Sequence, residues 1–155
     1  MMLRDVLEED LPIIHMIESK LYPKPWTLNF FHIMFHMNKD LFLVAVNDNE
    51  LIGYTVGEIE KRGKVSSSRM AGHIMNIAVK SQYQGIGVGT MLLDEIESRF
   101  IDKGVNISYL EVRESNMRAQ QVYKHRGYEY VRTVESYYGD EDGFIMTKKL
   151  DQRSI

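Results

Sequence analysis

Three glycines stand at alternate positions near the middle of the chain, at residues 85, 87 and 89 in the run Gln84–Thr90. The run follows the apolar residues Ile77–Val79 and precedes an amphipathic stretch, so it predicts a turn between a strand and a helix. Alternating glycines let backbone N–H groups approach a ligand without Cβ obstruction, and the start of a helix adds partial positive charge. A phosphate or pyrophosphate is the ligand that such a turn suits.

Two other interpretations of this turn stay open on these residues alone. It can be a connection without a ligand, or a dinucleotide-binding fingerprint, for which Glu111 and Glu114 end the next predicted strand at roughly the right distance. Against the fingerprint, the spacing is GxGxG instead of GxGxxG, and Ser81–Gln84 separates the strand from the glycines. Too little chain also remains for a second mononucleotide-binding half.

A second group of polar residues follows about 30 positions later. Asn116, Ala119 and Tyr123 are spaced i, i+3 and i+7, so they share one face of a predicted helix, and the small residue leaves a groove between the polar ones. Alternatively, Tyr123 packs in the core with its hydroxyl tethered.

Two ionisable residues fall on neighbouring predicted strands. Alternation puts Glu111 on the same face of its strand as Tyr109 and Arg113, where a carboxylate is usually solvated or paired with a neighbour such as that arginine unless it has a functional role. His73 lies on the preceding predicted strand, where a lone histidine is either catalytic or structural.

The elements that must position these residues read βααβββαβαββ, which predicts an α/β fold with a mixed sheet flanked by helices. The predicted strands are Met2–Val6, Leu41–Val46, Leu51–Glu60, Met70–Val79, Ile107–Val112, Tyr128–Tyr138 and Phe144–Lys149. The predicted helices run from the acidic start at Glu8 to Leu21, from Thr27 to Met37, from the glycine turn to about Gly104, and from Ser115 or Asn116 to about Arg126. Lys61–Arg69 reads as a loop, and Ser81–Gly89 as the glycine-rich turn.

Length and composition favour one ordinary globular domain over residues 1–150 with a short tail at 151–155. The net charge of -3 gives no pull toward nucleic acid or anionic membranes, and no apolar run is long enough for a membrane span. The chain has no cysteine, which excludes disulfides and a cysteine nucleophile, and no metal-ligand spacing is evident. We expect a cytoplasmic location.

The ordered segments resemble those of the GNAT superfamily of N-acetyltransferases. Gln84, Gly87 and Gly89 match its Q/R-x-x-G-x-G/A signature, which wraps the pyrophosphate of coenzyme A. Leu110–Tyr128 is similar to the corresponding segment of ribosomal-protein alanine N-acetyltransferases and archaeal protein N-terminal acetyltransferases. The opening LRDVLEEDLP, GHIMNIAV at Gly72–Val79 and YYGDEDGFIM at Tyr137–Met146 extend the resemblance over most of the chain.

The resemblance implies the GNAT fold, with about seven strands and four helices, and transfer of an acetyl group from acetyl-CoA to an amine. It assigns the general base to Glu111, a catalytic part to His73, and protonation of the leaving thiolate to Tyr123. The residues that it implies for cofactor binding are Ile77, Ala78, Val79, Gln84, Gly85, Ile86, Gly87, Val88, Gly89, Thr90, Asn116 and Tyr123.

For the substrate, the resemblance implies protein or peptide N-termini, with ribosomal proteins and nascent chains as candidates. Tyr137 and Tyr138, with Tyr22, are the implied substrate-binding residues; the other interpretation of the tyrosine pair is a hairpin with a solvated acidic turn. Lys24 departs from the related eukaryotic catalytic subunit, which carries a glutamate there. Acetylation of lysine side chains or small amines, and an inactive acetyl-CoA-binding module, stay open as alternatives, as do the oligomeric state and the division of the base role between His73 and Glu111.

Overall fold

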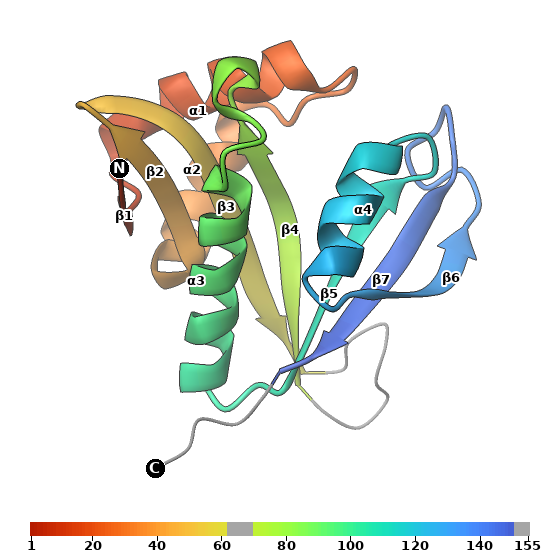
Figure 1. Ribbon diagram of the computed structural model, residues 1–155. Helices are drawn as coiled ribbons and strands as arrows, with labels where there is room; N and C mark the ends of the chain where they lie inside the picture. Colours follow the sequence, from red (N-terminus) through yellow and green to blue (C-terminus); the bar gives the residue numbers. More distant parts are fainter. Residues whose placement is uncertain (62–69, 151–155) are drawn as a thin grey trace. The chain divides into compact units, whose positions relative to one another are not determined.

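The computed structural model describes residues 1–61 and 70–150, which form four α-helices and a seven-stranded mixed sheet of order β1-β2-β3-β4-β5-β7-β6 (Figure 1). Strands β4 and β5 pair in parallel, whereas β1–β2, β2–β3, β5–β7 and β6–β7 are antiparallel. The strands are β1 Met2–Asp5, β2 Phe42–Asn47, β3 Glu50–Glu60, β4 Ala71–Val79, β5 Ile107–Arg113, β6 Glu129–Val134 and β7 Gly143–Lys149. The helices are α1 Leu11–Leu21, α2 Leu28–Met37, α3 Val88–Asp102 and α4 Met117–His125. The predicted fold class is confirmed.

Nearly all of the predicted loop Lys61–Arg69, and the predicted tail at 151–155, lie outside the described residues. Within the described ranges, no helix is both long enough and apolar enough to cross a membrane. The chain divides into two compact units, one of Met1–Glu58 with Asn76–Arg99 and the other of Ile59–Met75 with Phe100–Ile155. Strands β3 and β4 and helix α3 contribute residues to both.

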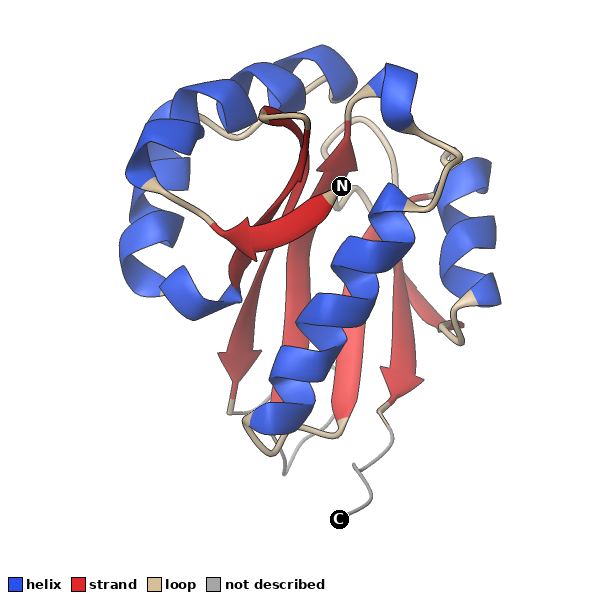
Figure 2. Ribbon diagram, turned by 60° about the vertical axis from the view of Figure 1, so that its left-hand side comes forward, coloured by secondary structure: helices blue, strands red, loops and turns tan. Residues whose placement is uncertain are grey.

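The first unit places helices on both faces of β3 (Figures 1 and 2). The Thr27 side chain caps α2 by accepting from the Phe30 N–H at 3.1 Å, as predicted. Phe31 of α2 is fully buried, and its ring lies edge-on to Tyr54 of β3, 5.7 Å away. The preceding residue, Gly53, faces Leu92 of α3. Successive strand residues point to opposite faces, so α2 and α3 cover opposite sides of β3.

The second unit packs α4 on one face of β7. Phe144 and Met146 line a cavity of about 290 Å³ with Gln120 and Lys124 of α4. Ile145, between them on the strand, points to the other face and packs against Tyr109 of β5. That other face is the one that carries Glu111, because Tyr109 and Glu111 are two residues apart on β5.

Three predicted details are wrong. Strand β6 ends at Val134 instead of Tyr138, because Ser136 and Gly139 have positive φ values, 52° and 84°, that turn the chain there. Helix α3 already begins at Val88, so Gly89 lies in its first turn and not in the preceding loop. Met37, which the sequence pattern placed on the apolar side of this helix together with Phe31 and Met34, is 70% exposed, because it lies at the end of α2 beyond the buried part of that side.

Candidate active site

The glycine-rich turn in the first unit has the geometry of an anion cradle. Gly85 and Gly87 have φ values of 82° and 96°, which favour glycine, and a Cβ on Gly87 would meet no heavy atom within 4 Å. The Met91 N–H donates to the Gly87 carbonyl at 3.0 Å, which closes the first turn of α3. The N–H groups before Met91 have no acceptor in their own helix, so they are available to a ligand. This open, donor-rich turn fits a pyrophosphate.

The end of β4 beside this turn is held by side chains from elsewhere in the first unit. The Tyr22 hydroxyl donates to the Ile77 carbonyl at 2.8 Å, and the Gln84 side-chain amide donates to the Val79 carbonyl at 2.9 Å. Gly53 lies so close that a Cβ there would be 2.9 Å from the Ala78 carbonyl oxygen. The structure therefore brings Tyr22, which the resemblance assigns to substrate binding, against the strand that it assigns to cofactor binding.

A buried carboxylate, which the sequence reasoning missed, anchors the same region. Glu18 of α1 is 2% exposed, and it accepts hydrogen bonds from the Tyr54 hydroxyl, from the Asn76 side chain at 2.7 Å and from the Trp26 N–H at 3.0 Å. Burial and the negative charge of Glu18 raise the pKa of Tyr54 well above its usual value. The spacing in the sequence could have indicated this burial, because Glu18 follows Ile14 by four residues and so lies on the apolar face of α1.

In the second unit, His73 and Glu111 are in direct contact. The distance from His73 Nε2 to Glu111 Oε1 is 2.7 Å, and the two side chains are only 10% and 6% exposed. The parallel register of β4 and β5 sets His73 opposite Tyr109, and the two rings stack at 4.4 Å with an angle of 3° between their planes. The prediction that His73 and Glu111 lie on adjacent strands is confirmed.

The second carboxylate oxygen of Glu111 is a buried acceptor. Among the described residues, none donates a hydrogen bond to Oε2. Tyr137 lies beside the carboxylate: burial, followed by the negative charge of Glu111, raises the pKa of Tyr137 to about 12. Tyr137 remains 39% exposed, so it joins a buried ionisable pair to the surface.

Arg113 does not pair with Glu111, so that alternative is wrong. Its guanidinium instead pairs with Asp140 at 3.0 Å and Glu141 at 2.9 Å, and it lies over the ring of Tyr138 at 4.4 Å. The acidic turn after the tyrosine pair is therefore tethered to β5 and is not simply solvated. Sequence reasoning missed this role, because the partners are 27 and 28 residues apart.

Helix α4 carries the two remaining predicted residues. Asn116 is its N-cap, and the Asn116 side chain accepts from the Ala119 N–H at 3.1 Å. Tyr123 packs edge-on to Tyr128, with 6.0 Å between the ring centres. Burial raises the pKa of Tyr123 to about 12, and the proximity of Tyr123 contributes to the raised pKa of Tyr138.

The predicted site residues thus fall into two sets. The first unit holds Tyr22 and the cofactor-binding run Ile77–Val79 with Gln84–Thr90. The second unit holds His73, Glu111, Asn116, Tyr123, Tyr137 and Tyr138. The candidate acid–base residues therefore lie in one unit and the candidate anion cradle lies in the other.

The chain is similar over most of its length to known acetyltransferases. Residues 9–128 match a family described as the acetyltransferase (GNAT) family. The chain is 31% identical over 151 residues to an uncharacterized N-acetyltransferase of Methanocaldococcus jannaschii, covering 96% of this chain and 92% of that protein. It is 30% identical over 154 residues to an N-alpha-acetyltransferase of Saccharolobus solfataricus, with the same two coverages. The crystal structure of Chaetomium thermophilum Naa20 with a bisubstrate analogue is similar with a TM-score of 0.86 at 26% identity, covering 97% of this chain and 87% of that one.

Proposed function

Because this chain belongs to the GNAT family of acetyltransferases, whose cofactor is acetyl-CoA, we propose that it acetylates the N-terminal α-amino group of proteins or peptides. The amine attacks directly while enzyme, cofactor and peptide are held together, with no acetylated enzyme residue. The observation that carries this proposal is the adjacency of Tyr137, Glu111 and His73, which sets a surface-exposed tyrosine beside a buried proton acceptor.

The acceptor for the proton of the amine is Glu111. An α-amino group has a pKa near 8, so at neutral pH about nine in ten molecules carry the extra proton, which has to be removed. Glu111 Oε2 is buried without a hydrogen-bond donor among the described residues, while Oε1 is held by His73. The free oxygen accepts the proton of the substrate, and the held oxygen keeps the carboxylate in place.

The cofactor fits the open glycine turn. Gly85 and Gly87, with the first N–H groups of α3, bind the pyrophosphate, and Ile77–Val79 binds the pantetheine arm through its backbone. When bound, acetyl-CoA supplies the thioester that the amine attacks. Asn116 contributes a further cofactor contact. Tyr123 donates its hydroxyl proton to the departing sulfur, because burial keeps that hydroxyl protonated.

A peptide N-terminus is the substrate class that the tyrosine pair suits best. The rings of Tyr137 and Tyr138 lie edge-to-face, with centres 4.8 Å apart, and Gly143 approaches Tyr137 so closely that a Cβ would be 3.0 Å from it. Such fixed rings can wall a slot, and their hydroxyls can hydrogen-bond a peptide backbone. The relative from S. solfataricus, an N-alpha-acetyltransferase, supports the same substrate class. Tyr22 completes the substrate contacts.

Mass spectrometry on paired peptides tests the proposal. Each pair shares one lysine-containing sequence, with the N-terminus free in one member and blocked in the other. We expect one acetyl group on the free member, at the α-amine, and none on the blocked member. Equal acetylation of both would show that lysine side chains are the substrate. If neither peptide is acetylated but small amines are, the substrates would be small-molecule amines and not peptides. Glu111→Gln is the matched negative control.

A further inference from the structure

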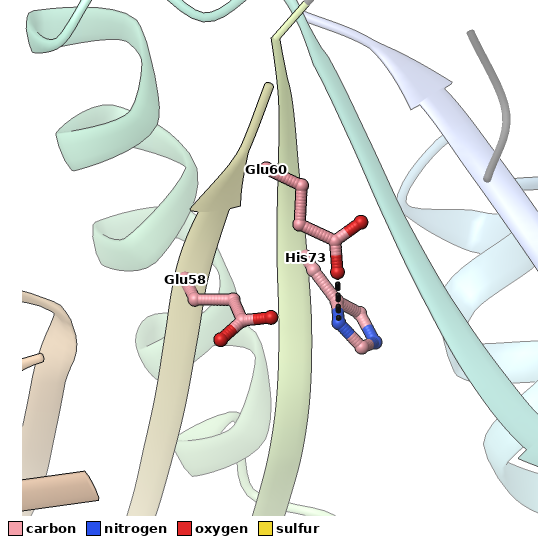
Figure 3. A group of neighbouring side chains, drawn as sticks. All are labelled: Glu58, Glu60 and His73. Atoms are coloured by element: carbon pink, nitrogen blue, oxygen red, sulfur yellow. Dashed lines mark ion pairs between the residues drawn. The ribbon is translucent and has the colours of Figure 1, made fainter. Parts of the chain in front are cut away.

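Glu60, the last residue of β3, contacts Nδ1 of the His73 imidazole (Figure 3). Glu111 contacts the other ring nitrogen, Nε2. Glu60 Oε1 lies 3.3 Å from His73 Nδ1, and Glu60 Oε2 accepts a hydrogen bond from the Tyr109 hydroxyl at 2.5 Å. The Glu60 side chain is 24% exposed, compared with 10% for His73. Of the three side chains of Glu60, His73 and Glu111, that of Glu60 is thus the most exposed to solvent.

Both ring nitrogens of the imidazole face a carboxylate, and the 3.3 Å approach of Glu60 to Nδ1 is an ion-pair contact without hydrogen-bond geometry. Glu111 faces Nε2, Glu60 faces Nδ1, and the ring of Tyr109 covers one flat face. Tyr109 also donates to Glu60, so the residue that stacks on the ring and the residue that faces Nδ1 are tied to each other. Rotation of the ring would break both nitrogen contacts together.

The positions of the protons on the imidazole nitrogens determine the role of Glu60. A carboxylate has only acceptor oxygens, so a lone pair on either ring nitrogen would be repelled by the carboxylate that faces it, which is Glu60 at Nδ1 and Glu111 at Nε2. A proton on each nitrogen converts both contacts into attraction between N–H and carboxylate. We propose that Glu60 is a positioning residue that keeps a proton on Nδ1 of His73 and thereby fixes the imidazole edge presented to Glu111.

This inference rests on the proposed function, since it assigns His73 to the support of Glu111 as the base. In that arrangement Glu60 and Glu111 are two carboxylates that share one imidazole. When Glu111 receives the proton of the amine on Oε2, the Nε2 contact holds Oε1 in place, and Glu60 keeps the ring from turning. Among the described residues, Tyr109, Tyr137 and Tyr138 are further titratable groups near this cluster, and Glu58 joins Glu60 and His73 in a group whose ligand atoms lie within 4.8 Å of one another (Figure 3).

The ring nitrogens of His73 give a direct readout. In ¹⁵N-labelled protein at pH 7, we expect the wild type to show a protonated Nδ1, and Glu60→Gln to show an unprotonated Nδ1, because an amide can donate to that nitrogen. Glu58→Gln removes the same charge from the same strand and should leave Nδ1 protonated. Glu60→Asp retains the carboxylate and should retain the proton.

Kinetics supply the second readout. We expect Glu60→Gln to lower kcat by at least about 10-fold, with the KM for acetyl-CoA unchanged, and to alter the pH profile of kcat/KM. Glu60→Asp should restore part of kcat. Unchanged His73 ring-nitrogen signals in folded Glu60→Gln would overturn the inference and leave the proposed function standing. Inactivity toward every peptide would instead overturn the proposed function, while the nitrogen signals would still test Glu60.

Discussion

Replacement of Tyr123 by phenylalanine removes the hydroxyl to which we assign protonation of the departing sulfur. Burial raises the pKa of this hydroxyl to about 12, so at pH 9 only about one molecule in a thousand carries the phenolate. Complete transfer of the hydroxyl proton to a thiolate, whose thiol has a pKa near 8.5, would be unfavourable by about 5 kcal/mol. The hydroxyl therefore acts by partial proton transfer as the carbon–sulfur bond breaks. For so weak an acid we expect Tyr123→Phe to lower kcat by about 10- to 100-fold, the low end of general-acid effects.

The assay is release of the free thiol at saturating substrates, from pH 6 to pH 10. Since the acid form persists over this range, the Tyr123→Phe profile should be displaced downward without a change in its shape. Tyr130→Phe is the control. Tyr130 is 52% exposed, and among the described residues its hydroxyl forms a hydrogen bond only with Thr133. We expect kcat of this variant to stay within twofold of the wild type. An unchanged kcat in Tyr123→Phe would refute the reasoning. So would a wild-type loss of activity near pH 9 that disappears in the variant, because it would mean that the hydroxyl ionises far below 12.

Three further outcomes are expected. Gly89→Glu should abolish acetyl-CoA binding by calorimetry, whereas Gly89→Ala should retain it, because a Cβ there meets only Val79 at 3.9 Å; equal affinities would argue against the cradle. Gly72→Ala should lower the free energy of unfolding by about 1–3 kcal/mol in denaturant titration, since its Cβ would lie 2.4 Å from the ring of Phe100; an unchanged midpoint would show that the ring moves freely. Asn116→Ala should cost about 1 kcal/mol of stability through loss of the α4 cap and should also weaken acetyl-CoA binding; loss of stability alone would limit the residue to capping.

Local signals account for what the sequence predicted well. The glycines at 85 and 87 carry the positive φ values that a tight turn needs, and Thr27 and Asn116 cap the helices that follow them. These features depend on neighbours within four residues, which the sequence displays directly. The contact of His73 with Glu111 was also predicted, because strand order and side-chain alternation were enough to bring the two residues together.

Contacts between distant segments explain what was missed. Glu60 contacts His73, 13 positions later, and Tyr109 on β5. The alternation of residues along β3 does not indicate which of its carboxylates makes these contacts. Arg113 has a carboxylate two residues before it on the same face, so local reasoning offered Glu111, whereas the folded chain brings Asp140 and Glu141. In both cases pairing across the sheet decides between partners of equal charge.

The anchoring of the Tyr22–Trp26 segment has a thermodynamic consequence. One end is fixed by the bond from the Tyr22 hydroxyl to Ile77, and the other by the bond from the Trp26 N–H to the buried Glu18. The two prolines between them restrict the backbone further. A segment that is already ordered has little conformational entropy left to lose, so the contact with a peptide that we propose for Tyr22 would count almost in full toward affinity. Under the proposed function, discrimination between substrates at this segment, which includes Lys24, would depend on shape and charge and not on which peptide can induce the loop to fold.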